Sequence, residues 1–197
     1  MSTADRPAVG RPPVTSHAAI EAAAFELFAT QGFDETTLDH IASRLGVGRR
    51  TLFRYFSSKN DIPWGQFDSS LQRLNRTLNA SPDEVPLFEA INRAVVDFNR
   101  LDDIEIPQHR QRMRLILHTP TLQAHSALRY EQWRAVIAEY VAARRGVAAN
   151  SLIPRLAGHV ALASALTAYE QWLESDVQTL EQLLVESASA LRSILDG

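Results

Sequence analysis

The chain of 197 residues contains no cysteine, and this absence removes several classes of protein. It can form neither a disulfide framework nor a thiolate metal site, which favours the reducing cytoplasm as its compartment. No stretch approaches the roughly 20 consecutive apolar residues that a membrane helix needs. The N-terminus also lacks the apolar run of a signal peptide. We therefore expect a cytoplasmic protein that does not interact with a membrane.

Familiar catalytic motifs are missing as well. The sequence has no Gly-x-Ser-x-Gly elbow, no phosphate-binding loop and no His-Glu-x-x-His zinc pair. Gly46-x-Gly48 lacks the third glycine of a dinucleotide fingerprint, and the six histidines are scattered. We expect no catalytic site, no cofactor and no metal site. An enzyme is therefore a less favoured class, and a helical interaction adaptor is another alternative to weigh against the motifs below.

Lysine and arginine together are slightly outnumbered by acids, 20 against 23, which gives a net charge of −3. Residues 1–64 hold seven of each sign, so residues 65–197 hold the other 13 bases and 16 acids. Against this balance, the segment from Arg49 to Lys59 has four cations and no acid. A local basic face on a nearly neutral domain suits a sequence-specific DNA-binding protein better than a general nucleic-acid coat.

Apolar residues recur at helical spacing along the whole chain, and no strand pattern is present. The sequence therefore predicts an all-α protein of about nine helices, with Thr37 as a simple N-cap and Ser58 with Asp61 as a capping box. Pro63 is expected to kink or restart the fourth helix. The expected helices cover residues 17–31, 37–45, 49–56, 58–78, 88–98, 107–117, 119–145, 151–174 and 177–196.

Residues 37–56 have the pattern of two short helices joined by a turn that contains Gly46 and Gly48. This is the layout of a helix-turn-helix, whose second helix enters the DNA major groove. Arg49 and Arg50 stand at the start of that second helix, and arginine can bond both O6 and N7 of guanine. We expect these two residues to read bases. The alternative is that they belong to an ordinary solvated face.

Three other residues of the motif are candidates for contacts with DNA. Thr37 can offer its hydroxyl and the first amides of its helix to a phosphate. Thr51 is close enough to the start of the second helix for a base or phosphate contact, and Arg54 can touch the DNA backbone.

Residues 14–74 resemble the DNA-binding domain of the TetR family of transcriptional regulators. The rest of the chain matches that family only as a helical body of the right length. A narrower likeness, to TetR-type regulators associated with mycofactocin, lies in residues 53–68 with their unusual Pro63-Trp64-Gly65. The family resemblance rests on Ala24-Phe25-Glu26-Leu27-Phe28, Gly32-Phe33, Thr36-Thr37, Ile41-Ala42, Leu45-Gly46-Val47, Thr51-Leu52-Phe53, Phe56 and Ser58-Lys59.

The resemblance implies that Tyr55 and Lys59 contact phosphates at the end of the recognition helix and the start of helix four. Three positions depart from the family's pattern. Phe53 replaces the usual tyrosine and loses its hydroxyl contact, whereas Tyr55 replaces a common histidine and can supply that contact. Gly48 stands where a serine or threonine cap is common, which predicts a weakly started recognition helix.

We expect three segments along the chain. Residues 1–15 combine prolines and two arginines without periodicity, which predicts a disordered arm that either reaches a minor groove or is a free tail. Residues 14–74 form the helix-turn-helix domain, and residues 75–197 form a helical effector-binding and dimerisation domain. The kink at Pro63 would let the second domain move the first.

The helical body is expected to enclose an effector pocket. Its candidate lining is aromatic and apolar, with two arginines from a short basic run: Phe67, Phe88, Arg110, Met113, Arg114, Leu117, Trp133, Tyr169 and Trp172. Ordinary core packing is the alternative for the apolar residues, and a solvated face is the alternative for the arginines. If the arginines meet a ligand, an anion such as the phosphates of an acyl-coenzyme A would suit them.

The last two helices, 151–174 and 177–196, are rich in alanine and leucine on more than one face. One helix-turn-helix reads few base pairs, so we expect a homodimer on palindromic operator half-sites, joined through these helices. An intramolecular core is the alternative. The sequence thus predicts a DNA-binding regulator. By the family's usual mode it is a repressor released by a small-molecule effector, and by the narrower likeness it controls mycofactocin-related genes.

Overall fold

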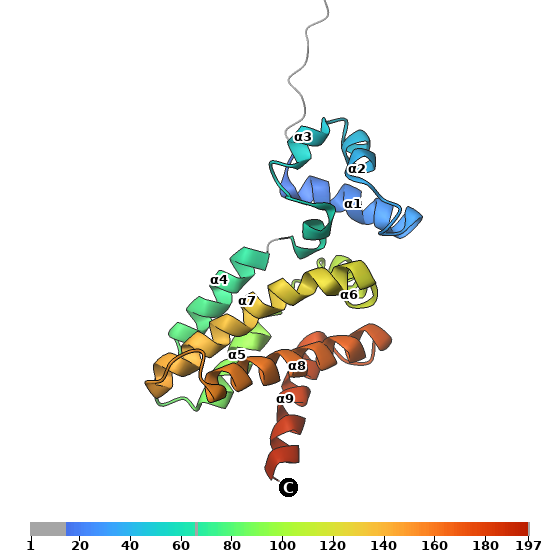
Figure 1. The fold of residues 1–197 in the computed structure, drawn as a ribbon. Helices are drawn as coiled ribbons and strands as arrows, with labels where there is room; N and C mark the ends of the chain where they lie inside the picture. The colour runs from blue at the N-terminus through green and yellow to red at the C-terminus, as the bar shows by residue number, and fades with distance from the viewer. Residues whose placement is uncertain (1–14, 66, 197) are drawn as a thin grey trace, which may run out of the picture. The chain divides into compact units, whose positions relative to one another are not determined.

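All regular structure in residues 15–65 and 67–196, the part that the computed structural model describes, is helical (Figure 1). The predicted all-α fold of about nine helices is confirmed, whereas the expected arm of residues 1–15 lies, apart from Thr15, outside the described residues. No helix in the described part is long and apolar enough to cross a membrane. Contacts divide the chain into two compact units, the first of which ends at Gly65.

The first unit contains α1 (His17–Gln31), α2 (Leu38–Leu45), α3 (Arg49–Leu52) and the 3₁₀ helix η1 (Lys59–Trp64). Ser16 caps α1 through a 3.2 Å bond from the Ala19 N–H, and Gly32 ends the helix. The helices α2 and η1 both pack against α1, and α3 packs against α2. Their shared core consists of fully or nearly fully buried side chains: Ile20, Ala24, Phe28, Ile41, Leu52, Phe56 and Ile62.

The start of α2 differs from the prediction. Thr37 accepts a hydrogen bond from the His40 N–H at 3.2 Å, and the Thr37 N–H in turn reaches Nδ1 of His40 at 3.4 Å. The simple cap that the sequence predicts is therefore a reciprocal capping box. Histidine can close the box because a neutral imidazole nitrogen accepts a hydrogen bond, as the usual glutamate or glutamine oxygen does.

The expected helix over residues 58–78 is interrupted at Pro63, where the sequence predicted a kink or a restart. Lys59–Trp64 forms the 3₁₀ helix η1, Gly65 adopts a positive φ of 46°, and α4 (Phe67–Asn79) starts afterwards. Pro63 lacks an N–H and blocks an α-helical turn, which explains the restart. The Ser58 hydroxyl binds the Asp61 carboxylate at 2.8 Å instead of capping the helix, so the predicted capping box is wrong.

The second unit contains α4, α5 (Leu87–Phe98), α6 (Ile106–His118), α7 (Pro120–Arg145), α8 (Leu152–Glu174) and α9 (Leu180–Asp196). Here α4 packs against α5 and α7, so its contacts belong to this unit and not, as the expected 14–74 boundary implies, to the first. The helices α7 and α8 lie side by side (Figure 1). They approach closely at Gly158, where a Cβ would lie 2.7 Å from the Arg134 carbonyl oxygen.

The last helix begins later than the sequence predicts. Val177 is 88% exposed and precedes α9. Thr179 accepts a 3.2 Å bond from the Gln182 N–H, and the Gln182 side chain accepts one of 2.9 Å from the Thr179 N–H. This capping box fixes the start of α9 at Leu180, because it satisfies backbone donors that a helix start leaves free.

Candidate functional site

The recognition helix α3 is a single turn, Arg49–Leu52, preceded by Gly48. Gly48 has no side chain and makes no capping bond, as its place in the sequence predicts. One turn of helix is not stable alone. Leu52, with 1% of its surface exposed, holds α3 to the core of the first unit. The exposed side chains before Leu52 are Arg49 and Arg50, the two predicted base-reading residues.

The two arginines have different surroundings. Nη1 of Arg49 lies 3.2 Å from Oδ2 of Asp39 on α2, and its guanidinium lies 5.4 Å from the centre of the Phe53 ring. Arg50 and Arg54 are exposed, and their side chains make no hydrogen bond or ion pair with another residue of the described ranges. The structure thus holds one predicted base-reading arginine in place and leaves the other unrestrained.

Lys59 is the only lysine in the chain, and its ammonium is held by the protein backbone. Nζ donates to the carbonyl oxygens of Phe33 at 2.6 Å and Asp34 at 3.2 Å, and it lies 4.3 Å from the centre of the Phe33 ring. Burial lowers the pKa of Lys59, partly opposed by the nearby Asp34 and Glu35 carboxylates. An ammonium has three donors, so one remains for a phosphate.

The other predicted contacts lie on the same unit. The Thr37 hydroxyl accepts from His40 and keeps its own proton, so it can still donate to a phosphate. Tyr55 is half-buried, and its hydroxyl donates to the Thr15 carbonyl oxygen. A phenol has one proton, so Tyr55 can donate to a phosphate only by giving up this bond. Thr51 is half-buried in α3.

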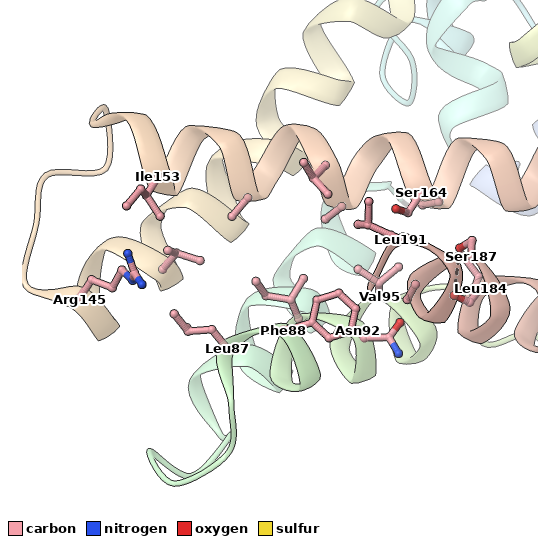
Figure 2. A pocket seen from close by; sticks show the side chains of 17 residues that line it. Leu87, Phe88, Asn92, Val95, Arg145, Ile153, Ser164, Leu184, Ser187 and Leu191 are labelled. Carbon is pink, nitrogen blue, oxygen red and sulfur yellow. Dashed lines mark hydrogen bonds between the residues drawn. The ribbon is translucent and has the colours of Figure 1, made fainter. Parts of the chain in front are cut away.

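The second unit contains a cavity of about 260 Å³ between α5, α8, α9 and the end of α7 (Figure 2). Leu87, Phe88 and Val95 of α5 line one side, Leu184 and Leu191 of α9 close one end, and Arg145 lies at the other end (Figure 2). The lining is largely apolar. Its polar side chains are Asn92, Arg145, Ser164 and Ser187.

Of the predicted ligand-binding residues, only Phe88 lines this cavity. The other candidates do not line it, because they pack elsewhere. Met113, Trp133, Tyr169 and Trp172 are buried core residues, and Phe67 and Leu117 are half-buried. The ring of Phe98 lies between Phe67 and Trp133, at centroid distances of 6.4 and 6.2 Å.

Neither predicted arginine lines the cavity. Arg110 forms a 2.8 Å ion pair with Asp176, donates to the Ser175 carbonyl oxygen at 3.2 Å and lies 4.3 Å from the centre of the Trp172 ring. It therefore ties α6 to the end of α8. Arg114 is exposed. The one arginine of the lining is Arg145, the last residue of α7, which was not among the predicted ligand-binding residues.

A chain of buried hydrogen bonds explains why Tyr169 is a core residue. Its hydroxyl donates to Oδ1 of Asn99 at 2.7 Å, and Nδ2 of Asn99 donates to the Val95 carbonyl oxygen at 2.7 Å. Nε2 of His109 lies 2.8 Å from the same hydroxyl and must be the donor, because the tyrosine proton is already used. Burial, with Arg112 nearby, lowers the pKa of His109 to about 4, and burial raises that of Tyr169.

Comparison with known proteins identifies both units. A family profile described as bacterial regulatory proteins, tetR family, matches residues 20–62, and one described as the MftR C-terminal domain matches residues 85–196. The chain belongs to the TetR family of transcriptional regulators. It is 41% identical over 188 residues to a Mycobacterium tuberculosis protein named as the mycofactocin biosynthesis transcriptional regulator MftR, covering 95% of each chain.

A more distant relative is the HTH-type transcriptional regulator TcmR of Streptomyces glaucescens, 31% identical over 87% of this chain and 79% of that one. Among solved structures, a TetR-family regulator of Syntrophomonas wolfei has a TM-score of 0.65 at 14% identity, covering 92% and 95% of the two chains. Thermus thermophilus FadR in complex with lauroyl-CoA has a TM-score of 0.56 at 20% identity, covering 92% and 94%. These structures share the fold, and the family consists of regulators, not enzymes.

Sequence reasoning missed two features of this TetR-family chain. Asp39 and Phe53 both contact Arg49, yet an exposed acid and an exposed ring carry no signal of a long-range contact. The sequence did contain a signal for the cavity, because alanines recur every four residues on the face of α8 that lines it: Ala157, Ala161 and Ala165. Small side chains at that spacing leave room along one helix face.

Lys59→Ala is expected to lower the free energy of unfolding by about 1–2 kcal/mol, because the Phe33 and Asp34 carbonyl oxygens lose a charged donor. It should also weaken binding to every DNA sequence alike. Arg54→Ala is the matched control, since it removes an exposed cation without a described partner and should leave stability unchanged. Denaturant unfolding, with gel shifts on specific and scrambled duplexes, measures both effects. Unchanged stability of Lys59→Ala would contradict the stabilising role.

The stability of the protein should fall as the pH drops from 6.5 to 4. Between these pH values His109 is protonated in the unfolded chain but stays neutral in the folded chain. The lowering of its pKa from 6.5 to about 4 corresponds to a loss of roughly 3 kcal/mol in the free energy of unfolding. His109→Gln keeps an N–H for Tyr169 and removes the titration, so its stability should depend less on pH. The exposed His118→Gln is the control. Equal pH dependence of wild type and His109→Gln would refute the assignment.

Proposed function

We propose that the chain represses transcription by reading operator half-sites with the exposed start of α3. The observation that carries this is the placement of Arg49 and Arg50 side by side at the tip of a one-turn helix that Leu52 anchors. Arginine at such a place can bond guanine O6 and N7 in the major groove. Thr37, Thr51, Arg54 and the remaining donor of Lys59 supply further contacts, mainly to phosphates, and Tyr55 joins them only if its bond to Thr15 opens.

The chain acts as a homodimer joined through α8 and α9. Support comes from large apolar side chains that a single copy leaves in solvent. Leu152 and Leu156 of α8 are 78% and 55% exposed, and Val185 of α9 is 44% exposed. On α8, Leu152, Leu156 and Ala163 fall on one exposed stripe, distinct from the face that lines the cavity. Burying this stripe against a second copy would place two recognition helices on one palindrome.

The cavity between α5, α8 and α9 binds the effector. Its apolar lining suits an aliphatic chain, and Arg145 at one end suits an anionic head group. An acyl-coenzyme A combines the two, and the same fold holds lauroyl-CoA in Thermus thermophilus FadR. In this proposal Arg145 binds the anionic end of the ligand, in place of Arg110 and Arg114, which the sequence suggested.

The genes under control are those of mycofactocin biosynthesis. Support comes from the 41% identity to the Mycobacterium tuberculosis protein named for that role, over nearly the full length of both chains. Access to chromosomal DNA places the protein in the cytoplasm, which the absence of cysteine also suits.

Selection of bound fragments from genomic DNA tests the operator assignment. Wild-type protein should enrich a palindromic site near mycofactocin genes, and Arg49→Ala or Arg50→Ala should each cost about 1–3 kcal/mol on that site and flatten the base preference. The measurement is a gel-shift titration on the enriched and a scrambled duplex. Equal specific binding by wild type and both variants would exclude base reading by these residues, and enrichment of unrelated loci alone would exclude the gene assignment.

A panel of acyl-coenzyme A thioesters tests the effector assignment. A ligand of the cavity should raise the melting temperature and weaken operator binding. Ala161→Phe fills the cavity and should abolish both effects, and Arg145→Gln should weaken them. Arg114→Gln is the control because Arg114 is exposed and does not line the cavity. Loss of the response in Arg114→Gln with retention in Ala161→Phe would show that the ligand binds elsewhere.

A further inference from the structure

The ion pair between Asp39 and Arg49 stands out because it places a carboxylate on a surface that is otherwise suited to binding DNA. Asp39 lies in the first turn of α2, two residues after Thr37, and Arg49 is the first residue of α3. Their side chains are 63% and 56% exposed. An ion pair this exposed contributes little to folding. An acid in the first turn also stabilises α2 through the helix dipole, and neither contribution accounts for the choice of Arg49 as its partner.

A carboxylate in this place disfavours DNA unless something offsets it. The start of α2 carries the free amides and the Thr37 hydroxyl that suit a phosphate, and Asp39 adds a negative charge there. The Arg49 guanidinium, 3.2 Å away, neutralises that charge only while it stays beside Asp39. If Arg49 swings out to a phosphate, the carboxylate is left facing the DNA backbone.

The hold on Arg49 leaves its reading edge available. A guanidinium has five N–H donors, and Asp39 accepts one of them in this structure. Bidentate binding of guanine needs two donors, so Arg49 can contact Asp39 and guanine at the same time. Phe53, one turn further along and 47% exposed, lies 5.4 Å from the guanidinium and limits its movement on that side.

We propose that Asp39 is a specificity-determining positioning residue, which presents Arg49 for guanine and penalises complexes in which Arg49 binds a phosphate instead. This rests on the proposed base reading by Arg49. Arg50, which has no such partner among the described residues, is free to adapt to the neighbouring base step or to the backbone. Asp39 thus lowers the affinity for random DNA and raises the ratio of specific to random binding.

The chain offers a matched control for the charge change. Glu26 on α1 pairs with Arg44 on α2 at 2.7 Å, and the two side chains are 60% and 59% exposed. This pair lies in the same unit and is equally exposed, but it involves no residue of α3. Glu26→Ala therefore removes the same charge as Asp39→Ala without releasing Arg49.

The experiment measures binding of the full chain to two probes, a duplex enriched by wild-type protein from a random pool and the unselected pool itself. Asp39→Ala should bind the pool about threefold more tightly, because a repelling charge is lost, and its ratio of specific to random binding should fall about tenfold. Asp39→Asn keeps an acceptor for Arg49 and should fall between wild type and Asp39→Ala. Glu26→Ala should keep the wild-type ratio within about twofold.

The double variant Asp39→Ala/Arg49→Ala decides whether Asp39 acts through Arg49. Its ratio should match that of Arg49→Ala alone, since nothing remains to be positioned. The proposal is overturned if Asp39→Ala leaves the ratio of specific to random binding unchanged, or if Glu26→Ala lowers that ratio as much as Asp39→Ala does. It is also overturned if the double variant has a ratio about tenfold below that of Arg49→Ala alone. If wild-type protein enriches a site and Arg49→Ala binds it normally, base reading by Arg49 fails, and the proposal fails with it. Melting curves of each variant identify any loss that is due to unfolding.

Discussion

A recognition helix of one turn depends on the core beneath it. Four residues cannot hold a helical shape in water, and Gly48 gives α3 no side-chain cap. Its geometry therefore comes from Leu52 and Phe56, which are 1% and 5% exposed in the core that α1 and α2 share. Lys59 adds a second anchor by joining η1 to the turn after α1 through two backbone carbonyl oxygens. The proposed reading of DNA by Arg49 and Arg50 thus depends on side chains that are buried beneath α3.

The sequence predicted the element types and the helix-turn-helix because both depend on local signals. Helical spacing of apolar residues identifies the helices. Ser16 caps the start of α1 and Gly146 ends α7, and neither boundary depends on distant residues. The errors have equally definite causes. His40 closes a capping box that is usually closed by glutamate or glutamine. Pro63 does restart the fourth helix, one of the two expected outcomes, but the segment before the restart is a 3₁₀ helix, which the sequence did not predict. Thr179, and not Val177, sets the start of α9.

The candidate site was less predictable because it depends on contacts across the sequence. Whether an aromatic residue lines a cavity or fills the core depends on its neighbours in the fold. Tyr169 and Trp172 would suit either role by residue type, and the structure buries both. The structural role of Arg110 depends on Asp176 and Trp172, which lie more than 60 residues away in the sequence and beside it in the fold. The same holds for Asp39, ten residues before Arg49 in the chain and beside it in the fold.

The cavity and the buried hydrogen-bond chain share two helices, which constrains how a ligand can act within the second unit. Val95 lines the cavity while its carbonyl oxygen accepts from Asn99, and on α8 Ala165 lines the cavity one turn before Tyr169. A ligand that moved α5 relative to α8 would strain the bonds from Tyr169 to Asn99 and His109, and so reach α6. It shifts the protein between conformations only by binding one arrangement of these helices better than another. An occupant that merely filled the present cavity would add stability and leave DNA binding unchanged.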